Sequence, residues 1–399
     1  MKKISFLLRL RRHFVVKLIG ASLLSIGIIA ASYFIGNSDI PMPDEMKVLR
    51  TFDNIMKFSG QYEDNVPDSI LLVNVCYDKQ LVDYSVHDIP VGQFVITDRE
   101  KLLRFLTAAY EADNYRYIMM DVFFERNIQS PQDSALFATI RKMNRIVIAN
   151  HTDSHLSDSL LKKKSAYADY TVTWKVTKFS HFQFTRDGDE PTMPLRIYED
   201  LTGKTIKRWG PFYYSDGRLC KNAITLNIPI RVAEDYSLET PNILEKRYEF
   251  LGADILAHDS IYPISMQLEN KIVIIGDFMT DVHDTYLGPQ PGSLICINAY
   301  NALQQGDHYF HWGWAFVQFL IYFIIGYFLM SNLTFARMVP NVYLRMLFFI
   351  FSVPTILLIV ALIAYVTTGY VYNMYIPTFL YWLYQFIYNI YMKSKMRVK

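Results

Sequence analysis

Neither end of the chain contains an acidic residue. All 38 acids fall within residues 39–307, whereas 12 of the 40 basic residues lie nearer the termini, six toward each end. Residues 36–311 therefore hold 28 basic residues against 38 acids, a formal charge of −10, and the two ends together carry +12. The acidic central block argues against nucleic acid as a partner, because proteins bind phosphate backbones through basic surfaces.

Sequence signatures of common catalytic sites are also missing. No HExxH, GxSxG, Walker or GxGxxG pattern occurs where its structural context would give it meaning. We therefore expect a protein that is not an enzyme and that holds no cofactor. An extracytoplasmic hydrolase that uses carboxylates is kept as an alternative.

Four long apolar runs lie between the basic ends, and each is long enough to cross ~30 Å of hydrocarbon as a helix. These runs are residues 18–35, 312–330, 346–366 and 371–392. The terminal cations fall in segments 1–17, 331–345 and 393–399, so the positive-inside rule places both termini in the cytoplasm and residues 36–311 outside. A cleaved signal peptide at the first run and the buried helices of a soluble protein are the alternatives.

The block outside the membrane alternates strand and helix patterns. Strands are expected at 69–76, 117–124, 146–150 and 271–276, and helices at 132–143, 293–305 and from Thr97-Asp98, where Thr97 and Glu100 resemble a capping box. Strands that are almost wholly apolar predict an α/β domain with a mainly parallel, buried sheet. Within residues 153–251 the expectations are short strands at 170–174 and 182–185, a turn at 215–217 and a helix at 231–247.

Several carboxylates are expected at or just beyond the strand ends, where a parallel sheet presents its ligand site. They are Asp121, Glu125, Asp277, Asp281 and Asp284. Such a cluster suits an amine or a hard cation such as Mg²⁺ or Ca²⁺. Loop capping and solvated surface charge are the alternative explanation, and His283 is either a metal ligand or a surface histidine.

Several of these pieces resemble one family in type and order. They are Asp121 in the strand at 117–124, Asp133 at a helix start, SDGR at 215–218, KIVIIGDF at 271–278, Asp284, Pro291-Gly292 and Asn298-Ala299. Together with one membrane helix before the outer domain and three after it, they resemble the second class of CHASE domains. These are the cyclase and histidine-kinase associated sensory extracellular modules of bacterial membrane receptors. The resemblance covers almost the whole chain.

The chain departs from this family pattern at three places. Where the first strand usually ends in acids it has Asn74, Cys76 and Asp78, and the element before the first helix is reduced to Asp98-Arg99, so Asp78 and Arg99 join the candidate ligand residues. Cys296 stands where the family usually has a histidine. If Cys76 and Cys296 both lie at the rim of the sheet they could form a disulfide. Otherwise all three cysteines, Cys220 included, are small buried side chains.

The resemblance implies a sensor or ligand-binding module in the bacterial inner membrane, with a periplasmic or extracellular domain. Family members normally continue into a kinase or cyclase, whereas here only residues 393–399 follow the last apolar run. We therefore expect the signal to pass in trans to a membrane or signalling protein, with a homo-oligomer also open. The alternative is a structural or assembly protein of the cell envelope.

Overall fold

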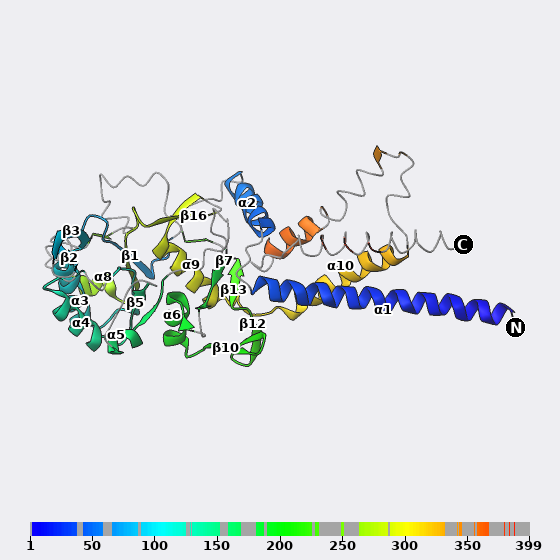
Figure 1. The fold of residues 1–399 in the computed structure, drawn as a ribbon, viewed down its shortest axis with the longest axis horizontal. Helices are drawn as coiled ribbons and strands as arrows, with labels where there is room; N and C mark the ends of the chain where they lie inside the picture. The colour runs from blue at the N-terminus through cyan, green and yellow to red at the C-terminus, as the bar shows by residue number, and fades with distance from the viewer. Residues whose placement is uncertain are drawn as a thin grey trace. The chain divides into compact units, whose positions relative to one another are not determined.

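The computed structural model describes residues 2–37, 43–58, 66–86, 89–124, 128, 130–151, 159–168, 181–186, 190–225, 228–230, 249–250, 263–285, 288–331, 341, 343–344, 355, 357–366, 379, 383 and 387. The chain divides into two compact units. One comprises Met1–Phe58 and Tyr309–Lys399, and the other, Ser59–His308, contains the predicted α/β domain. Figure 1 shows the sheet of this domain with helices on both sides.

Six parallel strands form the sheet, in the order β14-β1-β15-β4-β5-β6. Their bounds are β1 Ile70–Asn74, β4 Tyr117–Met120, β5 Ile146–Asn150, β6 Ser165–Tyr167, β14 Glu249–Phe250 and β15 Ile272–Gly276. The strands β1, β4, β5 and β15 confirm the four predicted ones, but β1 ends at Asn74 and β4 at Met120, two and four residues before the predicted ends. Each is buried along almost its whole length, as expected for a sheet that is covered on both faces.

Helices cover the two faces of the sheet as separate layers. On one side lie α3 Arg99–Ala112, α4 Asp133–Lys142, α5 Ser159–Lys163 and α8 Ile264–Leu268, which pack against alternate residues of the strands, such as Val73, Met120 and Ile275. On the other side lie α6 Met193–Thr202 and α9 Gly292–Gln305. The helices predicted at 132–143 and 293–305 are confirmed within one residue or two at each end.

The N-cap of α3 differs from the prediction. The helix begins at Arg99, and the Asp98 side chain accepts hydrogen bonds from the backbone N–H groups of Glu100 (3.0 Å) and Lys101 (3.1 Å). The capping box assigned to Thr97 and Glu100 is therefore wrong. Asp98 is the better cap because its carboxylate reaches two helix N–H groups at once.

Short antiparallel elements surround the sheet. They are β2 Lys79–Val86 with β3 Ile89–Thr97, β7 His181–Gln183 with β13 Ala223–Thr225, β8 Thr185–Arg186 with β9 Glu190–Pro191, β16 Val282–Thr285 with β17 Gly288–Pro291, and the three-stranded β10 Ile206–Trp209, β11 Phe212–Ser215 and β12 Arg218–Cys220. The turn predicted at 215–217 is confirmed, with Asp216 and Gly217 at φ 52° and 71°. The expectations for residues 170–174 and 231–247 lie outside the described residues.

The other unit is helical. Its elements are α1 Lys2–Gly36, α2 Pro43–Phe58, α10 Trp312–Met330 and a helical stretch at 357–366. The helices α1 and α10 run antiparallel, because Tyr33 contacts Phe310 just before α10 (5.9 Å between ring centres) and Ala21 lies beside Gly326 farther along it. Ile28, Tyr322 and Leu357 form an apolar cluster in this unit.

One helix among the described residues is long and apolar enough to cross a membrane, the stretch Phe14–Gly36 within α1. Trp312–Phe328 and Leu357–Val366 are apolar but shorter. The first predicted run therefore has a matching helix, and the run at 312–330 coincides with α10. Four membrane crossings stay a prediction, because residues 371–392 are almost entirely outside the described part of the chain.

Candidate ligand-binding site

The carboxyl ends of the central strands bring several polar side chains to one edge of the sheet. The residue after β4 is Asp121, the residue after β15 is Asp277, and His151 follows β5. The strands are parallel, so these ends meet at the same edge, which is where α/β sheets bind ligands. The hairpin β16–β17 and the start of α9 follow Asp277 in the chain and supply further side chains.

Asp121 is held between the end of β15 and the start of α9. Its backbone N–H donates to the Ile275 carbonyl (2.8 Å), and its Oδ2 accepts a hydrogen bond from the Ser293 hydroxyl (2.9 Å). Gly276 makes this approach possible, because a Cβ at that position would lie 2.0 Å from the Ser293 Oγ. The glycine that closes the predicted strand at 271–276 is therefore needed for close packing of α9 against the strand end.

Asp281 and His283 form a second polar pair on the hairpin beside α9. The His283 Nε2 lies 3.1 Å from the Asp281 Oδ1, and the Asp281 carbonyl accepts a hydrogen bond from the Gly292 N–H (3.0 Å). A Cβ at Gly292 would lie 3.0 Å from the Asp281 Oδ2 and 3.1 Å from the His283 Nε2. The first residue of α9 therefore has to be very small for this pair to sit against the helix.

Electrostatics couple the two pairs. Burial raises the pKa of Asp121, the charge of Asp281 raises it further, and His151, the Ser293 hydrogen bond and His283 oppose the shift. Burial, followed by the same two carboxylates, also raises the pKa of the Cys296 thiol well above its ordinary value. A cation bound beside them would offset the effect of the Asp281 charge and favour the ionised form of Asp121. We call Asp121, Asp281, His283, Ser293 and His151 the edge cluster.

Asp277 is a structural carboxylate rather than a member of the edge cluster. Its oxygens accept hydrogen bonds from the Lys79 ammonium (3.0 Å), the Thr280 hydroxyl (2.5 Å) and the backbone N–H groups of Met279 (3.1 Å) and Thr280 (2.8 Å). Burial alone would raise the pKa of Asp277, but these donors lower it to about 2. Its hydrogen-bonding capacity is already used within the protein.

Asn74 performs a similar structural role at the end of β1. Its Oδ1 accepts hydrogen bonds from the backbone N–H groups of Cys76 (3.0 Å) and Phe278 (3.3 Å), and its side chain is fully buried. It thereby ties the segment after β1 to the segment after β15. An amide at this position supplies a neutral acceptor where, by the resemblance, the family usually has an acid.

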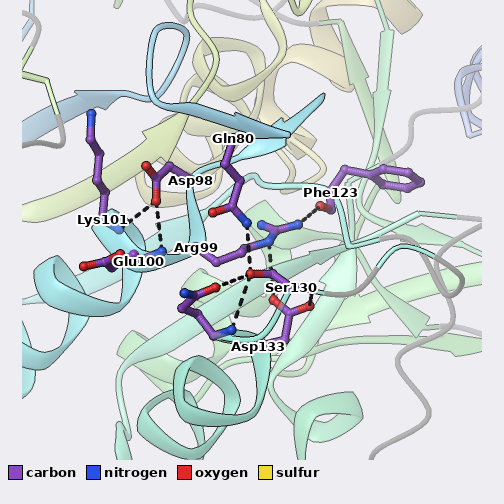
Figure 2. A network of polar contacts seen from close by, with 9 residues as sticks. Gln80, Asp98, Arg99, Glu100, Lys101, Phe123, Ser130 and Asp133 are labelled. Carbon is purple, nitrogen blue, oxygen red and sulfur yellow. Dashed lines mark hydrogen bonds and ion pairs between the residues drawn. The ribbon is translucent and has the colours of Figure 1, made fainter. Parts of the chain in front are cut away.

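Asp78 and Arg99 are both buried, and their side chains are paired with other groups of the protein. Asp78 is 4% exposed and pairs with the Lys101 ammonium, and burial raises the pKa of Asp78 in spite of that pair. Arg99 is 1% exposed and donates from Nη2 to the Phe123 carbonyl (2.8 Å). Figure 2 shows the Arg99 guanidinium between Phe123 and the segment that carries Ser130 and Asp133.

Two more contacts fix the Arg99 guanidinium. Its Nε lies 3.5 Å from the Asp133 Oδ1, and its Cζ lies 4.1 Å from the ring centre of Phe124. Burial lowers the pKa of Arg99 to about 10, while Asp133 opposes the change. Arg99 thus joins the start of α3 to the segment after β4, and Asp133 is its partner rather than a ligand residue.

The remaining candidate residues are Asp284, Glu125 and the cysteines. Asp284 is exposed on β16, and Glu125 lies outside the described residues. All three cysteines are thiols, so the Cys76–Cys296 disulfide is not formed in the structure. Cys220 and Cys296 are buried, whereas Cys76 is partly exposed near Asp277, so the expectation of small buried side chains holds for two of the three.

The structure adds two residues that the sequence patterns did not single out. His151 directly follows a predicted strand, and Ser293 begins a predicted helix, so a rule that collected every polar residue at these positions would have found both. Among the described residues, no group of three or more His, Cys, Asp or Glu side chains is arranged to hold a metal ion. The edge cluster consists of two carboxylates, two imidazoles and a hydroxyl.

A family model for the CHASE2 domain matches residues 44–331, more than two thirds of the chain. The protein belongs to the CHASE2 family. CHASE2 domains are extracellular sensory domains, and the apolar helix Phe14–Gly36 fits a membrane anchor that precedes such a domain. No significant match to this CHASE2 protein was found among curated proteins or among solved structures.

Proposed function

We propose that this CHASE2 protein is a membrane-anchored sensor whose edge cluster binds a small cationic ligand outside the cytoplasmic membrane. The helices then pass the change to another membrane protein in trans. The protein would perform no catalysis itself. In this proposal the ligand is an amine or a hard divalent cation, because either would offset the repulsion between Asp121 and Asp281.

The observation that carries the proposal is the position of α9 in the chain. Of its first two residues, Ser293 donates a hydrogen bond to the Asp121 carboxylate and Gly292 donates its N–H to the backbone carbonyl of Asp281. Its last residue, Gln305, is followed after six residues by Trp312, the first residue of α10. The helix α9, which is about 21 Å long, therefore begins at the site and ends only six residues before α10 in the chain, so a ligand that moves the start of α9 acts on a helix that is joined to the apolar helix by a short connection.

The helical unit supports an anchoring and signalling role. Val16, Ile19 and Leu23 on α1 are 60%, 55% and 66% exposed, which suits contact with lipid or with a partner helix. Gly326 on α10 faces Ala21 on α1 at close range, a small-residue contact of the kind that membrane helices use. We propose that two further crossings at 346–366 and 371–392 complete a four-helix bundle with both termini in the cytoplasm.

The ligand part of the proposal is tested by a thermal-shift screen of the full chain in detergent micelles, with Mg²⁺, Ca²⁺ and primary amines. A ligand at 100 times its Kd adds about 2.7 kcal/mol to the native state, a shift of several degrees in Tm. The shift should disappear in Asp121→Asn and Asp281→Asn and persist in Asp284→Asn. A shift that survives the first two variants would place the ligand elsewhere, and no shift with any cation would contradict the proposal.

The signalling part is tested separately by crosslinking and affinity capture of the full chain from membranes. We expect a kinase, cyclase or other signalling protein whose recovery changes when the ligand is added. A structural or assembly protein of the envelope would instead give constant, stoichiometric partners that do not respond to any ligand. That result would favour the alternative function.

A further inference from the structure

The three-stranded sheet β10–β11–β12 is amphipathic. Neighbouring strands pair antiparallel, with Lys207 opposite Tyr214 and Trp209 opposite Phe212, so these four side chains share one face. The opposite face contains the buried residues Ile206, Ser215 and Cys220, together with Arg208, Tyr213 and Arg218, which are exposed or partly exposed. The first face has no buried residue and is the outer one.

Aromatic rings and a cation meet on this outer face. Trp209 is 73% exposed, the highest value for any tryptophan among the described residues, and its ring lies 6.4 Å from that of Tyr214. Lys207 is exposed on the same face. The neighbouring Arg208 is exposed on the edge strand β10 but belongs to the opposite face, with its Cζ 6.0 Å from the ring centre of Tyr213. Exposed tryptophan and tyrosine beside cations are typical of protein surfaces at the membrane–water interface.

The charge of this segment is opposite to that of the domain around it. Residues 204–221 contain five basic residues and one acid, within a block whose formal charge is −10. The basic residues are Lys204, Lys207, Arg208, Arg218 and Lys221, and the acid is Asp216. The segment therefore complements an anionic surface, whereas the rest of the domain would be repelled by one.

The chain leaves the domain beside this sheet. The backbone N–H of Lys221, the residue after β12, donates to the His308 carbonyl (2.7 Å). Cys220 pairs with Tyr213, which is next to Phe212, so the turn with Trp209 is at the same end of the sheet as Lys221. Only three residues lie between His308 and Trp312, so the four Cα–Cα steps that join these two residues span at most about 14 Å.

From these observations we propose that the sheet β10–β11–β12 docks on anionic phospholipid headgroups of the membrane that holds α10. Trp209 and Tyr214 lie at the level of the headgroups, Lys207 contacts lipid phosphates from the same face, and Arg208 adds positive charge from the edge strand β10. The contact fixes the orientation of the domain relative to the bilayer. This inference rests on the membrane position of α10 in the proposed function and adds a second, lipid-binding surface to the protein.

The test uses the full chain in nanodiscs made either of phosphatidylcholine or of an equal mixture with phosphatidylglycerol, each with and without lipids brominated near the headgroup. Bromine quenches nearby tryptophan. The chain has five tryptophans, so the fluorescence of Trp209 is obtained by subtracting the fluorescence of Trp209→Phe from that of the wild type. Trp209→Tyr serves as a second reference. We expect this difference to be quenched in the anionic nanodiscs and less so in the neutral ones.

Charge reversal provides the matched comparison. The variant Lys207→Glu/Arg208→Glu should reduce the ratio of docked to undocked domain at least 25-fold, about fivefold for each cation lost. The variant Arg141→Glu/Lys142→Glu changes an exposed pair at the end of α4, away from β10 in the domain (Figure 1), and should leave the quenching unchanged.

The outcomes separate this inference from the proposed function. A chain that enters nanodiscs but shows no quenching of Trp209 would overturn the lipid contact alone, and would indicate that the surface faces water or another protein. Equal quenching in both double variants would overturn the role of Lys207 and Arg208. A chain that does not enter nanodiscs at all would overturn both the lipid contact and the membrane topology.

Discussion

Asp277→Asn offers a direct test of the division between structural and ligand-binding carboxylates. The pKa of Asp277 is about 2 in the folded protein and 3.8 in its ordinary state. That difference corresponds to ~2 kcal/mol of stability, since one pKa unit equals about 1.4 kcal/mol. The carboxylate is mostly shielded from solvent, with a side-chain exposure of 14%, so little of this is lost to screening.

The pH dependence follows from the direction of the shift. Because the pKa is lowered on folding, the stabilisation is fully present above about pH 4 and is lost as the pH falls through about 2. At pH 7 we therefore expect Asp277→Asn to lower the Tm of the full chain in micelles by about 4–8 °C. The difference from the wild type should shrink as the pH approaches 2.

The matched control is Asp284→Asn, which changes an exposed acid on the adjacent hairpin and should alter stability by less than about 0.5 kcal/mol. Lys79→Met removes one donor to Asp277 and should reproduce part of the loss. Equal Tm values for Asp277→Asn and the wild type at pH 7 would refute the structural role. Asp277 would then return to the set of candidate ligand residues.

Three further predictions concern the same edge of the domain. Gly276→Ala should destabilise by about 1–3 kcal/mol in thermal unfolding, because its Cβ would collide with the Ser293 hydroxyl, and wild-type stability would refute that packing. Asp121→Asn should match or exceed the wild-type Tm at pH 7, because burial and repulsion raise the pKa of Asp121 on folding. The difference should vanish below about pH 4, where the carboxyl is protonated in the unfolded chain as well as in the folded one, and a clear loss of stability at pH 7 would contradict this. Arg99→Met should cost about 3 kcal/mol by leaving Asp133 without its buried cation, with Arg99→Lys intermediate, and a neutral result in denaturant unfolding would show that the network is dispensable.

The sequence predicted the parallel sheet well because its strands are apolar on both faces, as in IVIIG at 272–276. The hairpins were not predicted, because their strands have no such continuous apolar run. In β16 the segment Val282–Thr285 is mostly exposed and lacks an apolar alternation, and β2 Lys79–Val86 mixes charged and apolar residues. Such strands form because of their tertiary contacts, which a local pattern does not contain.

The candidate site was predicted in location but not in detail. Position after a strand placed Asp121 and Asp277 at the same edge, and the structure agrees. Their different roles depend on partners that are remote in the chain, since Lys79 precedes Asp277 by 198 residues and Ser293 follows Asp121 by 172. The contacts of Arg99 were not predicted either, because only the fold shows that its guanidinium is enclosed by protein groups.

The most direct test of the account is the side of the membrane on which the domain lies. In a Cys76→Ser background, a cysteine placed at the exposed Lys142 should react with a membrane-impermeant maleimide in intact spheroplasts, and one placed at Lys393 only after lysis. Labelling of residue 142 only after lysis, with residue 393 labelled in intact cells, would contradict an extracytoplasmic sensor.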